Sequence, residues 1–526
     1  MGLIEEINIR KTFAIVSHPD AGKTTLTEKL LLFGGAIQVA GAVKSNKIKK
    51  TTTSDFMEIE KQRGISVATS VMAFDYGGKR INILDTPGHK DFAEDTYRTL
   101  SAVDSVIVVI DVAKGVEEQT EKLVKVCRMR QIPIMVFINK LDREGKDGFD
   151  LLDEIETKLG INVIPLTWPV GMGQRFQGVY NIYESKLNLF NAHGKQTDDD
   201  LVEINEEETE KFNNHIGENA TNELLDELHT IREIYDPFDA NSYLSGDISP
   251  VFFGSAINNF GVKELLDSFI QFAPNPLPRE TEQRIVNPEE EKFTGFIFKI
   301  HANIDPKHRD RIAFLRIVSG VFKRNTNYFH KRINKNLKFS NPTSFMAAKK
   351  SIIDEAFPGD IVGLYDSGNF KIGDSLTEGE ILDFKGIPSF SPEQFRYILN
   401  ANPMKRKQLD KGIIQLMDEG VAQLFTTIDS ERKIIGTVGA LQFEVIQYRL
   451  ENEYGASVTY EPLNIRKAFW VKSKDKDALE AFKKRKRRDL AYDKDGKMVY
   501  LAESEWSIKL VKDNFPEIEF FEKSEF

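Results

Sequence analysis

The sequence has 526 residues, enough for three or four domains of roughly 150 residues each. Its composition, 40% hydrophobic and 29% charged, is that of an ordinary globular protein that can bury several cores. The net charge of −10 excludes a protein that coats nucleic acid over its whole surface, and it leaves room for local basic patches.

The chain carries few signs of secretion or membrane insertion. A single cysteine, Cys127, excludes an internal disulfide and indicates a reducing compartment. The N-terminal residues include acids and no long apolar run, so we expect no secretory signal. The most apolar run, 106–110, is far too short to cross a bilayer. We therefore expect a cytoplasmic protein without membrane contact.

The first half of the chain alternates short Val- and Ile-rich runs with helical stretches. We predict an α/β fold with buried parallel strands at 13–16, 81–84, 105–110, 134–138 and 251–254. Residues from about 160 to 245 interrupt this pattern as an insertion. Between 198 and 235 it holds thirteen Asp and Glu against Lys211 and Arg232 only. We expect a solvated acidic helix pair there, with a specific partner site as the alternative.

The second half predicts two further domains after this first one, which covers 1–280. A Pro-rich linker, 274–278, precedes short strands with Gly and Asn turns, which predict a β-barrel domain over 290–385. Its expected strands are 294–300, 311–319, 344–347 and 360–364. The last domain, 388–526, has the order strand, helix, strand, strand, helix, strand, which predicts a split-βαβ α+β fold.

A tight loop follows the first predicted strand and opens a helix over 26–33. The loop is Ser17-His18-Pro19-Asp20-Ala21-Gly22-Lys23-Thr24. This pattern is typical of a P-loop, whose backbone N–H groups and helix N-terminus face phosphates. Lys23 would reach the β- and γ-phosphates, and the Thr24 hydroxyl would ligate Mg²⁺. Ser17 departs from the pattern, which usually has Gly there, and an ordinary turn before a helix is the alternative.

The strand at 81–84 ends in the run Asp85-Thr86-Pro87-Gly88-His89. An Asp that closes a strand, with a Gly three residues later, suits a turn that senses magnesium and phosphate. Asp85 can hold the ion through a water, and the Gly88 N–H can meet the γ-phosphate. His89 then lies beside the place where water attacks.

Two more strand ends indicate which base is bound. The strand at 134–138 is followed by Asn139-Lys140-Leu141-Asp142, and the strand at 251–254 by Ser255-Ala256. The Asp142 carboxylate can accept hydrogen bonds from the N1–H and amine of guanine, whereas adenine would leave it unpaired. Asn139 and the Lys140 stem would support the loop and cover the base, and backbone N–H groups at 255 and 256 would meet the guanine carbonyl. Each motif alone can be an ordinary turn, but their shared order indicates GTP binding.

A polar loop, 44–66, separates the first helix from the second predicted strand. Its length and polarity fit a segment that the γ-phosphate orders and that hydrolysis releases. Ser66 is placed to give Mg²⁺ a second protein hydroxyl. The Lys-rich stretch 44–50 is either a solvated loop or an RNA contact.

These motifs, with Arg63-Gly64-Ile65-Ser66, resemble those of the translational GTPases, and the run 54–66 is closest to the class-II bacterial release factors. Most of the wider family has Thr where this chain has Ser66, whereas these release factors typically have Ser. The resemblance spans the whole chain. It implies a ribosome-stimulated GTPase that uses GTP/GDP and Mg²⁺, with the ribosome and class-I release factors as partners and no DNA. The implied function is to promote the departure of class-I release factors after peptide release.

The resemblance also implies residue roles. It gives Lys23 and Thr24 the phosphate and Mg²⁺ roles, Ser66 the switch role, Asp20 a monovalent cation, and His89 the orientation of the attacking water. The basic stretches 309–338 and 483–488 would follow ribosomal RNA phosphates, or are solvated faces.

Three other functions are alternatives. The first is a translocation or recycling GTPase like elongation factor G, which we disfavour because that factor continues into further domains. The others are a metabolic GTPase subunit and a scaffold that binds GTP without hydrolysing it. The presence of His89 disfavours the scaffold.

Overall fold

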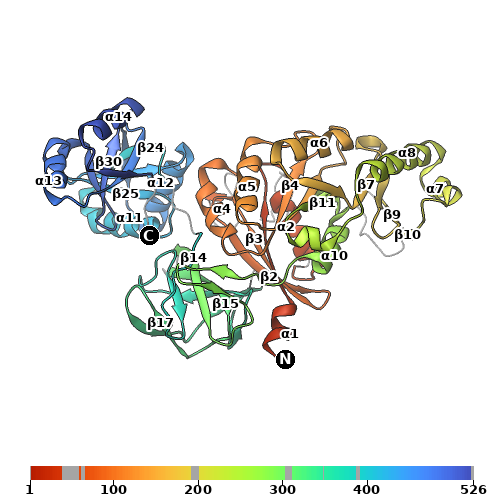
Figure 1. Ribbon diagram of the computed structural model, residues 1–526, viewed down its shortest axis with the longest axis horizontal. Coiled ribbons are helices and arrows are strands. Elements are labelled where there is room, and N and C mark those ends of the chain that lie inside the picture. The colour runs from red at the N-terminus through yellow and green to blue at the C-terminus, as the bar shows by residue number, and fades with distance from the viewer. Residues whose placement is uncertain are drawn as a thin grey trace.

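The computed structural model describes residues 2–37, 59–60, 66–190, 201–302, 311–346, 349–386 and 391–522. Most of the predicted switch loop, including Arg63, Gly64 and Ile65, lies outside these residues. Figure 1 shows three compact parts: an N-terminal α/β part that ends in a lobe of yellow and green helices, a β-rich part, and a C-terminal part. The domain boundaries at 1–280, 290–385 and 388–526 stay a prediction.

The N-terminal part is built on a mixed sheet with the strand order β2-β3-β1-β4-β5-β11-β6. The five predicted parallel strands are confirmed as β1 (Arg10–Val16), β3 (Lys79–Asp85), β4 (Ser105–Asp111), β5 (Ile134–Asn139) and β11 (Ile248–Phe253). Two strands of this sheet were not predicted. β2 (Ser70–Tyr76) pairs antiparallel with β3, and β6 (Asn162–Pro165) lies at the sheet edge beside β11.

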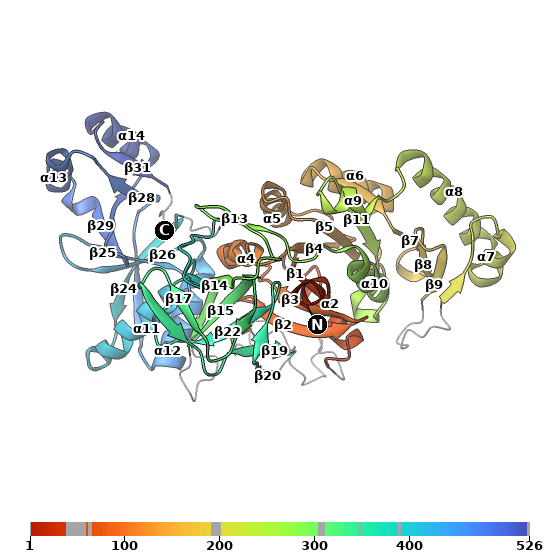
Figure 2. The same ribbon diagram turned by 60° about the horizontal axis from the view of Figure 1, so that its bottom comes forward.

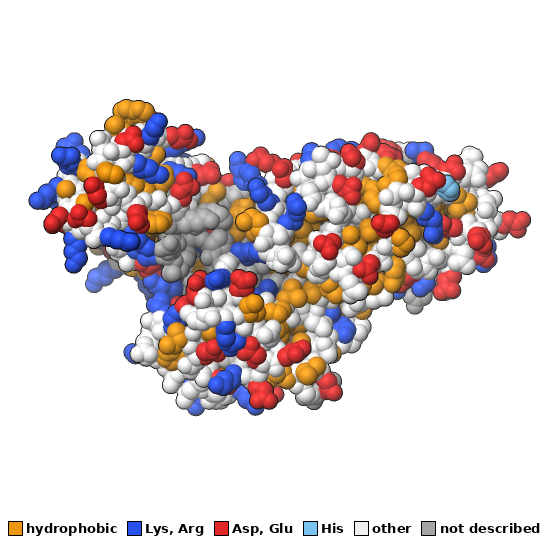
Figure 3. All heavy atoms as spheres, in the orientation of Figure 1, with side chains coloured by type: hydrophobic (Ala, Val, Ile, Leu, Met, Phe, Trp, Pro, Cys, Tyr) orange, Lys and Arg blue, Asp and Glu red, His pale blue; other side chains and the backbone are white. Residues whose placement is uncertain are grey.

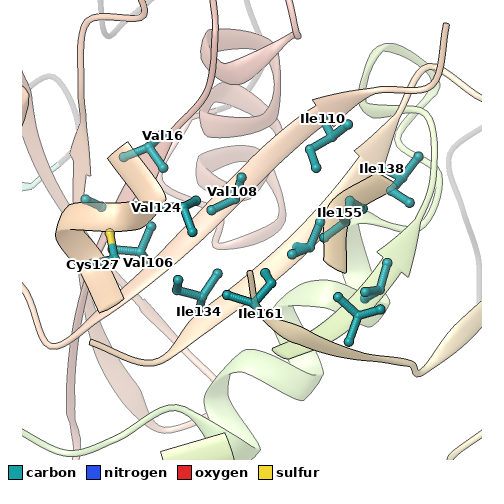
Figure 4. Close-up of a cluster of buried hydrophobic side chains, with 14 of the residues drawn as sticks. Val16, Val106, Val108, Ile110, Val124, Cys127, Ile134, Ile138, Ile155 and Ile161 are labelled. Atoms are coloured by element: carbon teal, nitrogen blue, oxygen red, sulfur yellow. The ribbon is translucent and has the colours of Figure 1, made fainter. Parts of the chain in front are cut away.

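Helices flank this sheet, and its strands are buried. The helices are α1 (Leu3–Asn8), α2 (Lys23–Phe33), α4 (Ala93–Leu100), α5 (Glu118–Met129), α6 (Gly148–Leu159) and α10 (Val262–Phe272). Figure 4 shows Val106, Val108 and Ile110 of β4 in one cluster with Val124 and Cys127 of α5. Burial raises the pKa of the Cys127 thiol to about 12, so it is protonated at neutral pH. Continuous apolar runs therefore form strands covered on both faces.

The insertion carries a small antiparallel sheet and the acidic helices. The sheet consists of β7 (Thr167–Val170), β8 (Gly178–Asn181), β9 (Lys186–Leu189) and β10 (Leu201–Glu203). The predicted helix pair is confirmed as α7 (Thr209–Ile216) and α8 (Glu218–Ile234), followed by α9 (Ala240–Leu244). Leu224, Leu228 and Ile231 are buried along one face of α8. The Trp168 indole N–H donates to Glu227 at 2.7 Å and fixes α8 to the small sheet.

The β-rich part is antiparallel, and it has a strand at each of the four predicted positions. Its strands are β12 (Arg279–Glu280), β13 (Ile285–Val286), β14 (Thr294–Ala302), β15 (Arg311–Ser319), β16 (Phe322–Lys323), β17 (Asn327–His330), β18 (Lys335–Lys338), β19 (Thr343–Met346), β20 (Lys349–Ile352), β21 (Glu355–Ala356), β22 (Ile361–Tyr365) and β23 (Ser375–Thr377). A bridge from β19 to β2, between residues 346 and 73, joins this part to the N-terminal sheet. Figure 2 shows the two parts side by side at that point.

The C-terminal part has the predicted order of strands and helices and then continues. The predicted elements are β24 (Gln394–Asn400), α11 (Arg406–Asp418), β25 (Gln423–Thr427), β26 (Lys433–Thr437), α12 (Ala440–Tyr454) and β27 (Val458–Pro462). The remaining elements are β28 (Lys467–Lys472), α13 (Lys476–Arg485), β29 (Leu490–Asp493), β30 (Met498–Ala502), α14 (Glu505–Asn514) and β31 (Glu519–Phe521). The four additional strands extend one sheet to eight strands. Among the described residues, none of the helices has the length and apolar character to cross a membrane.

A buried carboxylate joins the N-terminal and β-rich parts. Asp104, just before β4, is fully buried and forms ion pairs with Arg279 at 2.8 Å and with Arg316 of β15. The backbone N–H of Leu277 also donates to it, at 3.0 Å. Burial lowers the pKa of Arg279 to about 10, so its guanidinium group stays charged at neutral pH.

We expect Asp104→Asn to lower the thermal unfolding midpoint strongly. The amide keeps the size of the side chain but leaves two buried cations without a counter-charge, which costs about 3–5 kcal/mol. Asp75→Asn is the matched control, because Asp75 is 60% exposed and pairs with an exposed Arg80. Calorimetry of the two variants should show a large shift only for Asp104→Asn. Equal shifts would contradict the importance of this buried contact.

Candidate functional site

The predicted motifs meet at one edge of the N-terminal sheet. β3, β1, β4, β5 and β11 are neighbouring strands and all run parallel. The loops that follow them therefore leave the sheet at the same side, where ligands bind in open α/β sheets.

The loop between β1 and α2 bends through two left-handed residues, Asp20 with φ 68° and Gly22 with φ 97°. A side chain at Gly22 would lie 2.3 Å from the Asn139 amide nitrogen, so glycine is needed for this close approach. Ser17 is fully buried, and its hydroxyl donates to the His18 carbonyl at 2.8 Å. A serine therefore fits at the first position of this loop without a loss of hydrogen bonding.

The predicted phosphate and magnesium residues lie together. The Lys23 ammonium lies 2.5 Å from Asp85 Oδ1, and both side chains are buried. The hydroxyls of Thr24 and Ser66 are 3.5 Å apart, although 42 residues separate them in the chain. Hydroxyl and carboxylate oxygens are the ligands that Mg²⁺ prefers, and it usually keeps several waters. The residues present fit such an ion.

The loop after β3 lies against the loop after β1. The Thr86 hydroxyl donates to the Ile15 carbonyl at 2.7 Å. A side chain at Gly88 would lie 3.3 Å from the backbone of His18 and Pro19, which is tighter than an ordinary contact. Pro87 lies between Thr86 and Gly88 in the chain, and its carbonyl accepts a hydrogen bond from the Thr96 hydroxyl at 3.2 Å.

His89 points away from this junction. Its Nδ1 accepts from the backbone N–H of Asp91 at 3.2 Å, at the start of a short 3₁₀ turn, Lys90–Phe92. The side chain is 33% exposed and lines a cleft of about 1590 Å³ between the N-terminal and C-terminal parts. Within the described residues, no hydrogen bond joins His89 to the loop at 17–24. The structure therefore places His89 beside the phosphate loops, facing open space.

Asn139 joins three loops. Its amide donates to the Ala21 carbonyl at 2.8 Å, and its Oδ1 accepts from the N–H groups of Lys140 and Ala256 at 2.9 Å each. The Leu141 N–H donates to the Gly254 carbonyl at 3.2 Å. The amide therefore fixes the predicted base-binding loops against the predicted phosphate loop.

Asp142 is held by the loop after β11. The Ser255 hydroxyl donates to Asp142 Oδ1 at 2.5 Å and accepts from Asn258 at 3.0 Å. The backbone N–H groups of Ser255 and Ala256 already donate, to the Phe260 carbonyl and to Asn139. The expected bond from these N–H groups to a guanine carbonyl thus requires an exchange of partners.

Three contacts at the site were not predicted from the sequence. Lys140 donates to Asp111 at 2.6 Å and to the Asp20 carbonyl at 2.5 Å. Burial would raise the pKa of Asp111, but the Lys140 hydrogen bond and two backbone N–H groups hold it below its usual value. His18 lies 3.0 Å from Glu117, and burial lowers the pKa of the imidazole. Asp111 closes β4 as Asp85 closes β3, which is the signal that could have revealed it.

Comparisons with known proteins agree along the chain. Residues 8–275 match the family described as elongation factor Tu GTP binding domain. Residues 292–379 match elongation factor G domain 2, and residues 384–512 match the C-terminal domain of class II release factor RF3. A crystal structure of a Thermus thermophilus protein is 23% identical, with a TM-score of 0.71 over 89% of this chain and 71% of that chain. At this identity the likeness concerns the fold alone.

Proposed function

Because the chain belongs to the elongation factor Tu-type translational GTPases and is of the release factor RF3 type, we propose that it acts in translation termination. A translational GTPase binds GTP and GDP, hydrolyses GTP and interacts with the ribosome. In the proposed function this protein binds the ribosome after peptide release and promotes the departure of the class-I release factor. The match of residues 384–512 to the RF3 C-terminal domain carries this proposal. Its test is the rate at which a labelled class-I factor leaves post-release ribosomes.

In the proposed nucleotide site, the loop at 17–24 surrounds the phosphates with backbone N–H groups. Lys23 is held in place by Asp85 until it meets the β- and γ-phosphates. Thr24 and Ser66 would give their hydroxyls to Mg²⁺, and Asp85 would hold it through a water. Bound there, Mg²⁺ would supply positive charge against the phosphate oxygens. Asp20 is our candidate for a monovalent cation.

In this proposal, Asp142 selects guanine over other bases. Ser255 occupies one carboxylate oxygen and fixes the orientation of the group. The second oxygen and the remaining lone pairs can accept from the guanine N1–H and amine. Asn139 and Lys140 hold the loop, since they contact the Ala21 and Asp20 carbonyls respectively.

Hydrolysis depends on His89. The imidazole Nδ1 accepts from Asp91, which leaves Nε2 to orient a water. Since His89 faces an open cleft, we propose that contact with the ribosome turns it toward the γ-phosphate. Positioning and charge stabilisation then suffice for phosphoryl transfer, without a covalent intermediate. The free protein is accordingly expected to hydrolyse GTP slowly.

The basic stretch in the β-rich part contributes less to ribosome binding than its composition suggests. Six of its described cations pair with carboxylates of the protein itself: Arg311, Arg316, Lys323, Arg324, Lys331 and Arg332. For 311–338, these pairs favour the alternative that the stretch is a solvated face and not an RNA contact. Work on the ribosome would place the protein in the cytoplasm, and we keep that location as part of the proposal.

Elongation-factor-like translocation is the second candidate, because residues 292–379 match elongation factor G domain 2. On pre-translocation ribosomes, we expect this protein with GTP to leave the messenger RNA in place while elongation factor G moves it by one codon. A toeprint or a fluorescent label at the messenger RNA end measures the movement. If this protein moved the messenger RNA at the rate of elongation factor G, its function would be translocation and not termination.

A further inference from the structure

The C-terminal part carries a run of six consecutive cations, 483–488, at the end of α13 and in the turn that follows. Four of these residues are exposed: Lys484, Arg485, Arg487 and Arg488. Lys483 and Lys486 lie near Glu480 and Asp489, at 3.8 and 3.5 Å. Lys484, Arg487 and Arg488 form no ion pair with any described residue, so their charges face solvent. They contrast with the paired cations of the β-rich part.

An exposed tryptophan lies on the neighbouring helix. Trp506 near the start of α14 is 70% exposed, whereas Trp168 and Trp470 are 1% and 4% exposed. Leu510, four residues on, is 41% exposed, and Lys509 shares this face. Glu505 and Ile508 of α14 line the cleft near His89, whereas Trp506 and Leu510 are not among its lining residues. Trp506 therefore faces a separate surface.

The basic run and Trp506 belong to one packed unit. Phe482 of α13 lies against Phe515, just after α14, with ring centroids 5.0 Å apart, and also contacts Tyr500 of β30. Lys486 lies 6.0 Å from the centre of the Tyr500 ring, which belongs to the same hydrophobic cluster as Val511 of α14. In Figure 3, Lys and Arg side chains gather over α13 at the left edge of this part, and hydrophobic atoms project over α14 at its top.

A flat exposed aromatic ring beside unpaired cations is the combination that binds single-stranded nucleic acid. Bases stack on the ring, and the cations neutralise phosphates. A protein partner would instead need a broader apolar surface around the tryptophan, whereas Leu510 is the one other large exposed apolar side chain described on α14. The net charge of −10 makes this local positive charge the more distinctive.

We propose that α13 and α14 form an RNA-binding surface on which an unpaired base stacks on Trp506 while Lys484, Arg487 and Arg488 contact the flanking phosphates. The inference rests on the proposed function in that the ribosome supplies the RNA. It goes further by naming the surface, the single-stranded form of the RNA and the stacking residue.

The test measures binding of the full-length protein to a fluorescein-labelled single-stranded RNA of mixed sequence, by fluorescence anisotropy at low salt. The RNA is about 20 nucleotides long, so that it exceeds the usual site size. Trp506→Ala should weaken binding about tenfold, because stacking on one aromatic side chain has this magnitude. Trp506→Phe should keep most of the affinity. Met404→Ala is the matched control, since Met404 is 91% exposed in the same part of the chain, and it should bind as the unaltered protein does.

The contribution of the basic run to RNA binding is measured separately, through the salt dependence of the affinity. Reversing Arg487 and Arg488 to Glu should lower the slope of log affinity against log salt by about 1.4, or about 0.7 for each lost phosphate contact. Reversing Lys407 and Lys411, exposed on α11, should leave the slope unchanged. RNA should also quench the tryptophan emission of the intact protein, because the other two tryptophans are buried.

Wild-type affinity in Trp506→Ala, or RNA binding without quenching, would overturn the stacking proposal. If Trp506→Ala lost binding to RNA-free ribosomal proteins but kept its RNA binding, the partner of this surface would be a protein and not RNA. Failure of the termination function is distinguishable. RNA binding through Trp506 without faster class-I factor departure would leave this surface standing and refute the proposed function.

Discussion

His89→Ala is expected to bind GTP with unchanged affinity and to lose ribosome-stimulated hydrolysis by about 10²–10⁴-fold, the range for a lost group that orients or deprotonates a water. The affinity should persist because His89 makes no hydrogen bond to the loop at 17–24 among the described residues, and its ring lines an open cleft. The loss should appear in a single-round hydrolysis assay with saturating ribosomes.

Lys90→Ala is the matched control for His89, because Lys90 is its neighbour and lines the same cleft. Its stimulated rate should stay within a few-fold of the unaltered protein. Full turnover by His89→Ala in the same assay would remove the histidine from the catalytic role.

Asp142→Asn is expected to weaken GTP binding by about 10²–10⁴-fold, because two hydrogen bonds to a charged group contribute about 1.5–3 kcal/mol each. An asparagine can donate through its amide, whereas a carboxylate only accepts. Xanthosine triphosphate carries a carbonyl where guanine carries its amine, so the variant should now favour the xanthine nucleotide. Competition binding with GTP, ATP and xanthosine triphosphate measures this preference.

Asp153→Asn, an exposed carboxylate on α6, is the control for Asp142 and should leave the preference unchanged. If Asp142→Asn also keeps the full preference for GTP, the base is chosen elsewhere. The contact between Ser255 and Asp142 would then serve only to hold the two loops together.

The sequence predicted the strands of the N-terminal sheet because their signals are local. Runs such as 105–110 are apolar throughout, and a strand covered on both faces needs this composition. The motif residues stand at the ends of these strands, and parallel strands bring their ends together. β2 was missed because its apolar run, 71–74, is short and is flanked by Ser70, Asp75 and Tyr76, and its antiparallel pairing with β3 leaves one end partly exposed.

Contacts between distant segments could not be predicted from local patterns. Lys140 meets the Asp20 carbonyl 120 residues away, and Arg316 meets Asp104 212 residues away. Both depend on how the sheet and the β-rich part are arranged. The same limit applies to the cations at 311–338. The sequence left open whether this stretch follows RNA phosphates or is a solvated face, whereas folding brings the carboxylates of Asp374 and Asp383 to two of its cations.

The rate of class-I release factor departure from post-release ribosomes tests the central claim most directly. A labelled class-I factor is bound to ribosomes whose peptide has been released, and its loss is followed with this protein and GTP, with GDP, and without the protein. We expect departure to accelerate only when the protein and GTP are both present. An unchanged rate under these conditions, with ribosome-stimulated GTP hydrolysis intact in the same sample, would contradict the account.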